Sequence, residues 1–302
     1  MTLKDYAALI DARLAELLPE AEKKIPDTDE IPWLLENAMR YSVMAGGKRL
    51  RPAMLLACAD MLGVDRAEAL LDACALEMIH TYSLIHDDLP AMDNDTLRRG
   101  RPTNHVVYGE AMAILAGDGL LTHAFAHMTA QALQYPERAQ AHLRAIRAVA
   151  DAAGMEGMVA GQSVDVYCEK HGCDPEDKKG QLDYIHLNKT AAMIRGALLA
   201  GAELGDPTEE ARKAFSDYGE ALGVAFQVAD DILDATSTTE VMGKTVGKDA
   251  AEGKLTYVAL YGLEESRARL EQLTQRAIDA IAPLDRDGFF TELAKDLLIR
   301  KN

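Results

Sequence analysis

Apolar residues recur at helical spacing along most of this 302-residue chain, and that pattern limits the possible folds more than any other feature. In the first segment the apolar side chains stand mostly three or four residues apart until Pro19 interrupts the pattern. Helical spacing predicts helices over 3–18, 33–45, 52–62, 66–89, 107–130, 137–165, 181–204, 208–234, 252–265, 267–281 and 287–300. No stretch alternates as a strand would. The sequence therefore predicts an all-α bundle of about ten or more helices.

The composition supports a large aliphatic core in a single domain. Hydrophobic residues make up 48% of the sequence but aromatic residues only 5%, so Ala, Leu, Ile, Val and Met must fill most of the core. No linker-like tract or repeat interrupts residues 1–302, which predicts one domain over the whole chain. A formal net charge of −17 argues against nucleic acid as a general partner.

We expect neither a membrane span nor a targeting segment in this sequence. No apolar run reaches the roughly 18 residues that a membrane-spanning helix needs. Asp5, Asp11 and Glu16 in the first segment suit neither a secretory signal nor a transit peptide. The four cysteines show no C-x-x-C spacing and are expected to be reduced thiols. These features predict a cytoplasmic protein.

Two acidic clusters, each at the end of an apolar helical stretch, carry the chemistry. The first is the D-D-x-x-x-x-D run at 87–93, and the second is the D-D-x-x-D run at 230–234. Carboxylates this close repel one another, so a fold that keeps them charged normally supplies cations. Oxygen-only ligands favour Mg²⁺, which also takes waters and phosphate oxygens. The two clusters predict a site that holds a diphosphate through several magnesium ions.

Pro90 explains how the first cluster can act as one unit. On a continuous helix, Asp87 and Asp93 would point about 120° apart around the axis. Pro90 makes the chain bend after the helix, which can bring the two carboxylates together. No proline interrupts the second cluster, so Asp230 and Asp234 share one helix face. For either cluster alone, a solvated acidic helix end is the alternative.

Basic residues accompany both clusters. They are Lys48, Arg49 and Arg51 after a Gly46-Gly47 pair, Arg98-Arg99 after the first cluster, and Lys244, Lys248 and Lys254 after the second. The paired glycines and the following helix start can approach an anion closely. The spacing does not match the phosphate loop of NTPases. Any one of these basic residues is best interpreted as a solvated surface charge. Their occurrence beside both acidic clusters, however, indicates an anion-binding site.

Together these motifs resemble the trans-isoprenyl diphosphate synthases, and most closely the bacterial farnesyl diphosphate synthases. The matching segments are G-G-K-R-x-R-P at 46–52, M-I-H-T-Y-S-L-I-H-D-D-L-P-A-M-D at 78–93, R-R-G at 98–100, Lys189-Thr190, G-x-x-F-Q-x-x-D-D-x-x-D at 223–234, Gly243-Lys244 and K-x-T-Y at 254–257. The resemblance spans almost the whole chain. It implies a bundle around a deep central cavity, usually a homodimer, that binds isopentenyl diphosphate and an allylic diphosphate.

The resemblance also implies roles for individual residues. About three Mg²⁺ would be held, two directly by Asp87 and Asp93 with support from Asp88, and one by Asp230 with Asp231 and Asp234 reaching it through water. The allylic diphosphate would be bound by Arg98, Lys189 and Lys244. The diphosphate of isopentenyl diphosphate would be bound by Lys48, Arg51, His80 and Arg99, with Arg300-Lys301 approaching it. Oxygens around Lys189, Thr190 and Gln227 would stabilise an allylic carbocation.

Product length is expected to depend on Tyr82. It stands five residues before Asp87, roughly 7.5 Å deeper along the same helix, where its ring would form a floor for the growing tail. The expected product is therefore C15 farnesyl diphosphate. The main alternative is a geranylgeranyl diphosphate synthase with a C20 product, because the run K-x-x-G-K-D at 244–249 also resembles those enzymes.

Other readings are less favoured. A terpene cyclase needs no second diphosphate pocket, and a non-catalytic regulatory subunit has no need of both acidic clusters. Glu77 and His80 form an E-x-x-H pattern of the kind found in di-iron bundles, but no second copy exists. His123 with His127, and the group Cys168, His171 and Cys173, could ligate metal, although packed or surface side chains are the favoured interpretation.

Overall fold

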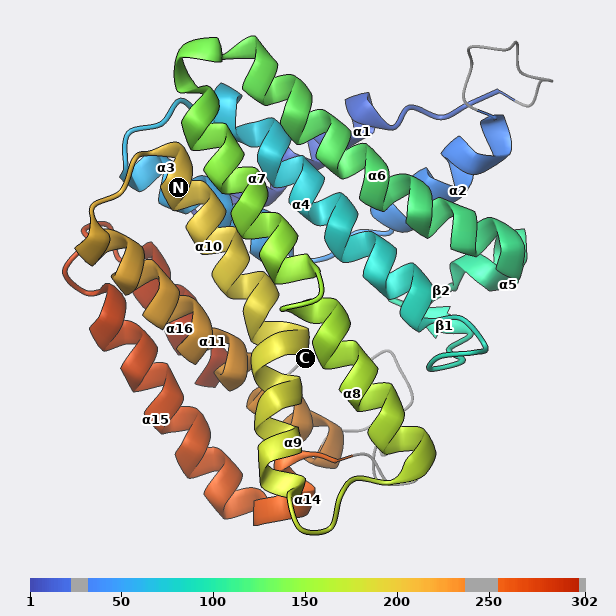
Figure 1. Cartoon of the computed structure of the whole chain (residues 1–302), viewed down its shortest axis with the longest axis vertical. Helices are drawn as coiled ribbons and strands as arrows, with labels where there is room; N and C mark the ends of the chain where they lie inside the picture. Colours follow the sequence, from blue (N-terminus) through green and yellow to red (C-terminus); the bar gives the residue numbers. More distant parts are fainter. Residues whose placement is uncertain (23–31, 237–254, 299–302) are drawn as a thin grey trace.

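The computed structural model describes residues 1–22, 32–236 and 255–298, and these residues are mostly helical (Figure 1). The first group of helices is α1 (Leu3–Leu17), α2 (Trp33–Val43), α3 (Leu50–Met61), α4 (Arg66–Asp87), α5 (Asn104–Tyr108), α6 (Glu110–Gln134), η1 (Pro136–Arg138), α7 (Ala139–Ala153) and α8 (Met158–His171). The second is α9 (Lys178–Ile185), the π-helical turn η2 (His186–Ala191), α10 (Ala192–Leu204), α11 (Glu209–Thr236), α14 (Tyr257–Tyr261), α15 (Leu263–Ile281) and α16 (Phe289–Leu298). The all-α prediction is confirmed.

Helix starts follow the capping residues in the sequence. Thr2 and Asp5 form a capping box at α1, in which each side chain accepts from the backbone N–H of the other residue. Asp65 caps α4 by accepting from the N–H of Ala67 at 2.9 Å. These local signals place the helix starts independently of tertiary packing.

Several predicted helices are divided, and those predicted boundaries were wrong. Gly109, with φ of 86°, separates α5 from α6 within the predicted 107–130 segment. Gly262, with φ of 81°, separates α14 from α15, so the break expected near residue 266 lies four residues earlier. The predicted 137–165 helix is interrupted between Ala153 and Met158. Apolar spacing continues across these breaks because the helices on both sides face the core, so periodicity alone does not reveal them.

A short antiparallel hairpin is the feature that helical spacing does not predict. Strands β1 (Leu97–Arg98) and β2 (Arg101–Pro102) pair around a two-residue turn. Both turn residues, Arg99 and Gly100, have positive φ, at 54° and 72°, as a tight hairpin turn requires. Arg98 therefore lies on a strand and Arg99 in the turn, so their side chains can have different partners.

The long helices lie side by side (Figure 1). Helix α4 packs along α6, while α10 packs along α7, α3 and α11. Gly201 on α10 permits a close crossing with α3, because a Cβ there would collide with the backbone of Leu55.

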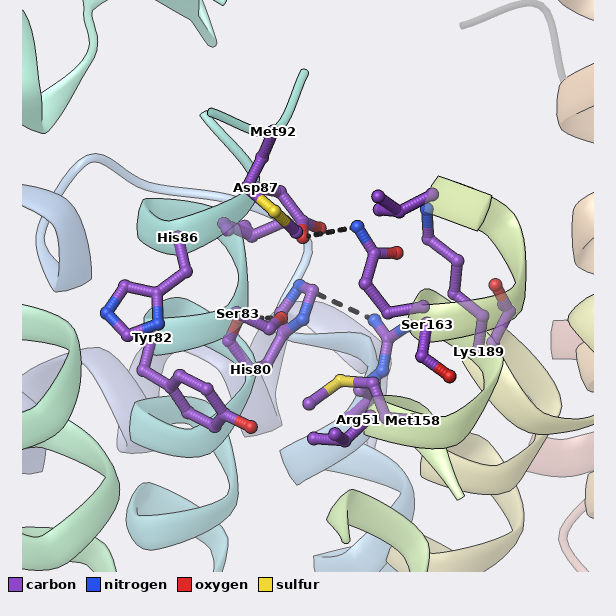
Figure 2. Close-up of a pocket in the computed structure, with 15 residues that line it drawn as sticks. Arg51, His80, Tyr82, Ser83, His86, Asp87, Met92, Met158, Ser163 and Lys189 are labelled. Carbon is purple, nitrogen blue, oxygen red and sulfur yellow. Dashed lines mark hydrogen bonds between the residues drawn. The ribbon is translucent and has the colours of Figure 1, made fainter. Parts of the chain in front are cut away.

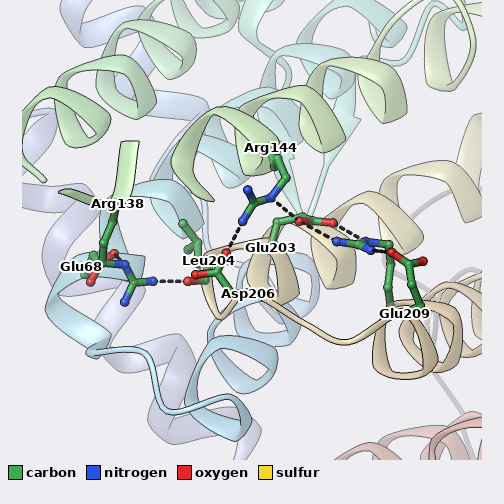
Figure 3. Close-up of polar contacts among 8 residues, drawn as sticks. Glu68, Arg138, Arg144, Glu203, Leu204, Asp206 and Glu209 are labelled. Carbon is green, nitrogen blue, oxygen red and sulfur yellow. Dashed lines mark hydrogen bonds and ion pairs between the residues drawn. The ribbon is translucent and has the colours of Figure 1, made fainter. Parts of the chain in front are cut away.

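Partly buried ion pairs connect α7, α10 and α11 (Figure 3). Glu203 of α10 accepts from Arg144 of α7 at 2.8 Å and from Arg212 of α11 at 2.6 Å. Burial alone would raise the pKa of Glu203, but these two guanidinium groups lower it. The carboxylate is therefore charged and links three helices.

Candidate active site

A cavity of about 580 Å³ opens beside the C-terminal end of α4. Its walls come from α3, α4, α8 and η2, and Figure 2 shows Asp87 and Met92 at one end of it and Tyr82 and Met158 toward the other. The lining residues are Arg51, His80, Tyr82, Ser83, Leu84, His86, Asp87, Met92, Met158, Val159, Gln162, Ser163, Val166, Lys189 and Thr190. The cavity thus joins a charged mouth to a largely apolar interior.

The first acidic cluster lies at this mouth. After α4 ends, the chain turns back, and the Asp93 N–H donates to the Asp87 carbonyl at 2.8 Å. The Asp87 carboxylate accepts from Gln162 Nε2 at 2.9 Å. Burial raises the pKa of Asp87 to about 6, although Lys189 opposes the rise and Asp93 adds to it. The bend predicted from Pro90 is confirmed, and it leaves a carboxylate whose charge needs cations nearby.

Asp88 is directed to Arg98 rather than to the cavity. It is 3% exposed, and Arg98 donates to it from Nε at 2.8 Å and from Nη2 at 2.6 Å. Burial raises the pKa of Asp88, and Arg98 opposes that rise. The pair ties the hairpin to the end of α4.

Of the residues predicted to bind the second diphosphate, Arg51 and His80 line this cavity, whereas Lys48 and Arg99 line two other pockets. Arg51 Nη1 lies 3.5 Å from His80 Nε2 (Figure 2), and Arg51 Nε is buried without a hydrogen-bond partner among the described residues. Arg99 donates to the carbonyl of Gly46, and a Cβ on Gly47 would lie 2.8 Å from its guanidinium group. Burial, Arg51 and Arg99 together lower the pKa of His80 well below its ordinary value. The result is a neutral imidazole among guanidinium groups, with Lys48 exposed on the adjacent loop.

Arg49, in the same basic run, points the other way. Its backbone is left-handed, with φ of 49°, and its side chain is buried in ion pairs with Glu77 at 2.6 Å and Asp11 at 2.7 Å. Arg49 therefore anchors the loop to α4 and α1. The contact also accounts for Glu77, the acidic member of the E-x-x-H pattern.

Lys189 and Thr190 lie on the π-helical turn η2. Helices α8 and α11 each approach this turn closely at a glycine. A Cβ on Gly161 of α8 would collide with the backbone of Lys189, and one on Gly223 of α11 would collide with Ala191. Lys189 Nζ lies 2.5 Å from the Asp165 carboxylate. Single π-helical turns inside helices are frequent at functional sites. Here the turn brings both predicted residues to the cavity wall.

The side chains of the second acidic cluster differ in burial and in their contacts. Asp231 is buried and accepts from Gln227 Nε2 at 3.1 Å and from the Tyr257 N–H at 2.7 Å, and Asp234 is also buried. Gln227 in turn accepts from the Thr190 hydroxyl at 2.9 Å. Asp230 is half-buried, and its charge raises the pKa of Arg51 against the larger lowering effect of burial. Since Arg51 lines the cavity, the second cluster faces the same region.

These carboxylates fit magnesium by the chemistry of their donor atoms. Asp87, Asp93 and Asp230 offer only oxygen, and Mg²⁺ takes one or two carboxylates together with waters and phosphate oxygens. Over residues 1–22, 32–236 and 255–298, no three His, Cys, Asp or Glu side chains converge into a complete metal site. A metal at these carboxylates would therefore need oxygens from a ligand.

Some predicted residues cannot be placed, and two contributors were missed. Lys244, Lys248, Lys254 and Arg300-Lys301 lie outside the described residues. Gln162 and Asp165, which bind Asp87 and Lys189, were not predicted. Their signal is a Q-x-x-D spacing that puts both side chains on one helix face, but no neighbouring charge cluster distinguishes it.

The histidine and cysteine groups of α6 and α8 make other contacts. His127 Nε2 lies 2.9 Å from His123 Nε2, and burial followed by His123 lowers the pKa of His127 to about 4. Cys168 is buried and lies 3.4 Å from the side-chain oxygen of Gln181. His171 packs against the ring of Tyr167.

A family model described as polyprenyl synthetase matches residues 32–284. The chain belongs to the polyprenyl synthetase family. This confirms the resemblance to trans-isoprenyl diphosphate synthases and makes the chain a short-chain prenyltransferase. None of the described helices has the length and apolar character that crossing a membrane requires.

Individual family members are similar over most of the chain. Geranylgeranyl pyrophosphate synthase 11, chloroplastic, of Arabidopsis thaliana is 49% identical over 259 residues, which cover 85% of this chain and 71% of that protein. The apo structure of a FPP/GFPP synthase from Zymomonas mobilis is 35% identical, with a TM-score of 0.83 over 98% of this chain and 97% of the other. A geranyltransferase from Helicobacter pylori, complexed with magnesium and isoprenyl diphosphate, is 31% identical, with a TM-score of 0.77 over 98% and 96%.

Proposed function

We propose that this prenyltransferase joins isopentenyl diphosphate to an allylic diphosphate and releases pyrophosphate in a magnesium-dependent reaction. One observation carries the proposal: a single cavity is lined by Asp87 and by Arg51, and continues into apolar space. A ligand that fits this arrangement has an anionic head and a hydrocarbon tail. Prenyl diphosphates have both.

We assign magnesium to Asp87, Asp93 and Asp230, about three ions by the resemblance to the family. When bound, these ions neutralise charge on the leaving diphosphate. Lys189 and Arg98 add fixed positive charge on the allylic side. Lys189 lines the cavity, and Arg98 is held by Asp88. Both are positioned before the substrate arrives, which is the condition for electrostatic stabilisation of a transition state.

Thr190 and Gln227 are proposed to stabilise the allylic cation. Thr190 lines the cavity and donates to Gln227, which donates to Asp231. This chain of hydrogen bonds fixes oxygen atoms beside the place where positive charge develops. The apolar side chains of Met158, Val159 and Val166 exclude water that would otherwise capture the cation.

The second diphosphate is assigned to Lys48, Arg51, His80 and Arg99. Because His80 is neutral, it can donate a hydrogen bond without adding charge to the crowded guanidinium groups. This anion stays intact through the reaction, so the contacts serve binding more than rate. Lys244, outside the described residues, is assigned to the allylic diphosphate.

The proposed product is C20 geranylgeranyl diphosphate, with C15 farnesyl diphosphate as the second candidate. The name of the Arabidopsis relative, at 49% identity, supports C20 and favours the alternative over the original expectation of C15. The Tyr82 ring, buried at the cavity wall, supports C15.

Incubation of the protein with geranyl diphosphate, isopentenyl diphosphate and Mg²⁺, followed by mass analysis of the dephosphorylated products, tests both parts. Dominant C20 alcohol supports the first candidate and dominant C15 the second. If neither a longer prenyl alcohol nor released pyrophosphate forms, the proposed reaction is wrong.

We also propose that the chain acts as one domain, as a homodimer, in the cytoplasm. Exposed apolar side chains on α6, Ile114 at 44% and Leu115 at 52%, support association through that helix. A solution mass of one chain by light scattering would contradict the dimer.

A further inference from the structure

We propose that His86 and Gly117 are positioning residues that hold the Tyr82 ring at the cavity wall and so limit the length of the product. The inference rests on the proposed prenyl transfer, but it holds for either product length. It concerns a column of side chains that runs from α6, through His86 and Tyr82 of α4, to the cavity.

The outer end of the column is a close contact between His86 and the backbone of α6. A Cβ on Gly117 would lie 2.9 Å from Cε1 of the His86 ring and closer still to Nε2 and Cδ2. His86 Nε2 also lies 3.1 Å from the carbonyl of Ile114. The ring therefore occupies space that any other residue at position 117 would fill.

The inner end of the column is an edge-to-face contact between His86 and Tyr82. The two residues are four apart on α4, and their ring centroids are 5.7 Å apart at an interplanar angle of 79° (Figure 2). Both residues line the cavity, and Tyr82 is 7% exposed. His86 thus contacts Tyr82 on one side and the backbone of α6 on the other.

This arrangement limits how far Tyr82 can move. A growing tail can gain depth only by displacing the phenol ring, and the ring can move back only if His86 gives way. His86 cannot retreat toward α6, because Gly117 and the Ile114 carbonyl already lie against its ring. The limit on product length therefore depends on Tyr82, His86 and Gly117 together rather than on Tyr82 alone.

The column predicts opposite effects for changes at its two outer positions. His86→Ala removes the support and lets Tyr82 move back, so products should lengthen by one isoprene unit. Gly117→Ala forces the imidazole away from α6 and toward the cavity that it lines, so products should shorten. In the double variant the added methyl group has no ring to push, and it should behave like His86→Ala.

Gly119→Ala is a matched control on the same helix. Its added Cβ would meet only the flexible side chains of Met39, at 3.1 Å from Sδ, and Leu35. It makes the same change in helix propensity two residues away and does not touch the column.

The experiment measures the ratio of longer to shorter prenyl alcohols for the wild type and these four variants, with geranyl diphosphate and excess isopentenyl diphosphate. We expect His86→Ala to raise the ratio roughly fivefold, equivalent to about 1 kcal/mol, and Gly117→Ala to lower it by a similar factor. Gly119→Ala should match the wild type. Circular dichroism checks folding, and His86→Asn replaces His86→Ala if that variant does not fold.

Equal ratios for Gly117→Ala and Gly119→Ala, or a double variant that shortens products like Gly117→Ala, would overturn the inference. An inactive wild type would instead overturn the proposed function. A wild type that elongates, with variants that leave the ratio unchanged, would overturn only the column.

Discussion

Lys189 Nζ lies 2.5 Å from Asp165 Oδ2, and this ion pair joins the π-helical turn η2 to α8 at the cavity wall. Burial would lower the pKa of Lys189, but Asp165 and Asp87 raise it overall, so the ammonium group is charged. Its position is set by a residue 24 positions earlier in the sequence.

Asp165→Asn should lower kcat/KM for the allylic substrate by roughly tenfold or more, the effect of about 1.5–3 kcal/mol for one charge-assisted hydrogen bond. The KM for isopentenyl diphosphate should stay unchanged, because Asp165 holds a group on the allylic side. Steady-state kinetics with each substrate varied in turn measures this. Asp151→Asn, which alters an exposed pair with Arg147, is the control. Equal effects on both substrates would contradict the positioning role.

Asp87→Ala and Asp230→Ala should each lower kcat by orders of magnitude and leave the helical fold intact. Each variant loses a proposed metal ligand whose main effect is on the transition state. The measurement is pyrophosphate release at saturating substrates and Mg²⁺, with circular dichroism to check folding. Asp217→Ala removes an exposed carboxylate elsewhere on α11 and should retain activity. Near-normal turnover in either site variant would show that the ligand assignment is wrong.

Arg98→Ala and Arg99→Ala should differ in both kinetics and stability. Arg99→Ala should chiefly raise the KM for isopentenyl diphosphate, by roughly 10- to 150-fold. Arg98→Ala should weaken binding of the allylic diphosphate. It should also lower the free energy of unfolding by about 1–3 kcal/mol, because it leaves buried Asp88 without its partner. Substrate-specific kinetics and urea unfolding measure the two effects. The assignment fails if both variants change the KM of the same substrate.

Tyr82→Ala should shift the main product toward a chain at least one isoprene unit longer. Removing the ring opens apolar space at the cavity wall that the tail can fill. Tyr82→Phe keeps the ring and should leave the product unchanged. Chromatography of the dephosphorylated products measures the shift, and an unchanged profile for Tyr82→Ala would show that another residue sets the length.

Stability should fall with rising pH because of His142. This fully buried side chain lies 3.1 Å from a carboxylate oxygen of Glu68 and 3.3 Å from one of Asp72. Burial would lower the pKa of His142, but the two carboxylates raise it overall. The folded state therefore binds this proton more tightly than the unfolded chain. The resulting stability is present below the unfolded pKa and is lost as pH rises through the folded value.

Urea unfolding at pH 6 and pH 9 tests the His142 contribution. The wild type should lose free energy of unfolding over this range, and His142→Gln should lose less. At pH 6 the variant should be less stable by about 3–5 kcal/mol, since buried Asp72 loses its cation, whereas Glu68 keeps its ion pair with Arg138. Equal pH dependence in the two proteins would contradict the prediction.

The sequence by itself determined the helical class of the fold and the chemical character of the site. Apolar spacing acts within a few turns, and capping residues such as Asp65 act on the adjacent turn, so both can be read locally. Pro90 predicted the bend after Asp87 for the same reason, because its effect is confined to the neighbouring residues. Both acidic clusters could be recognised without knowledge of their surroundings.

Only the tertiary structure decided which charged groups serve the cavity and which hold the fold. Lys48, Arg49 and Arg51 look alike in the sequence, but Arg49 alone is buried against Glu77 and Asp11. Gln162 reaches Asp87 across 75 positions, and no local pattern contains that pairing. A charged side chain takes the partner that packing places beside it, and packing depends on contacts distant in sequence. For this reason the residue types were predictable, whereas their partners were not.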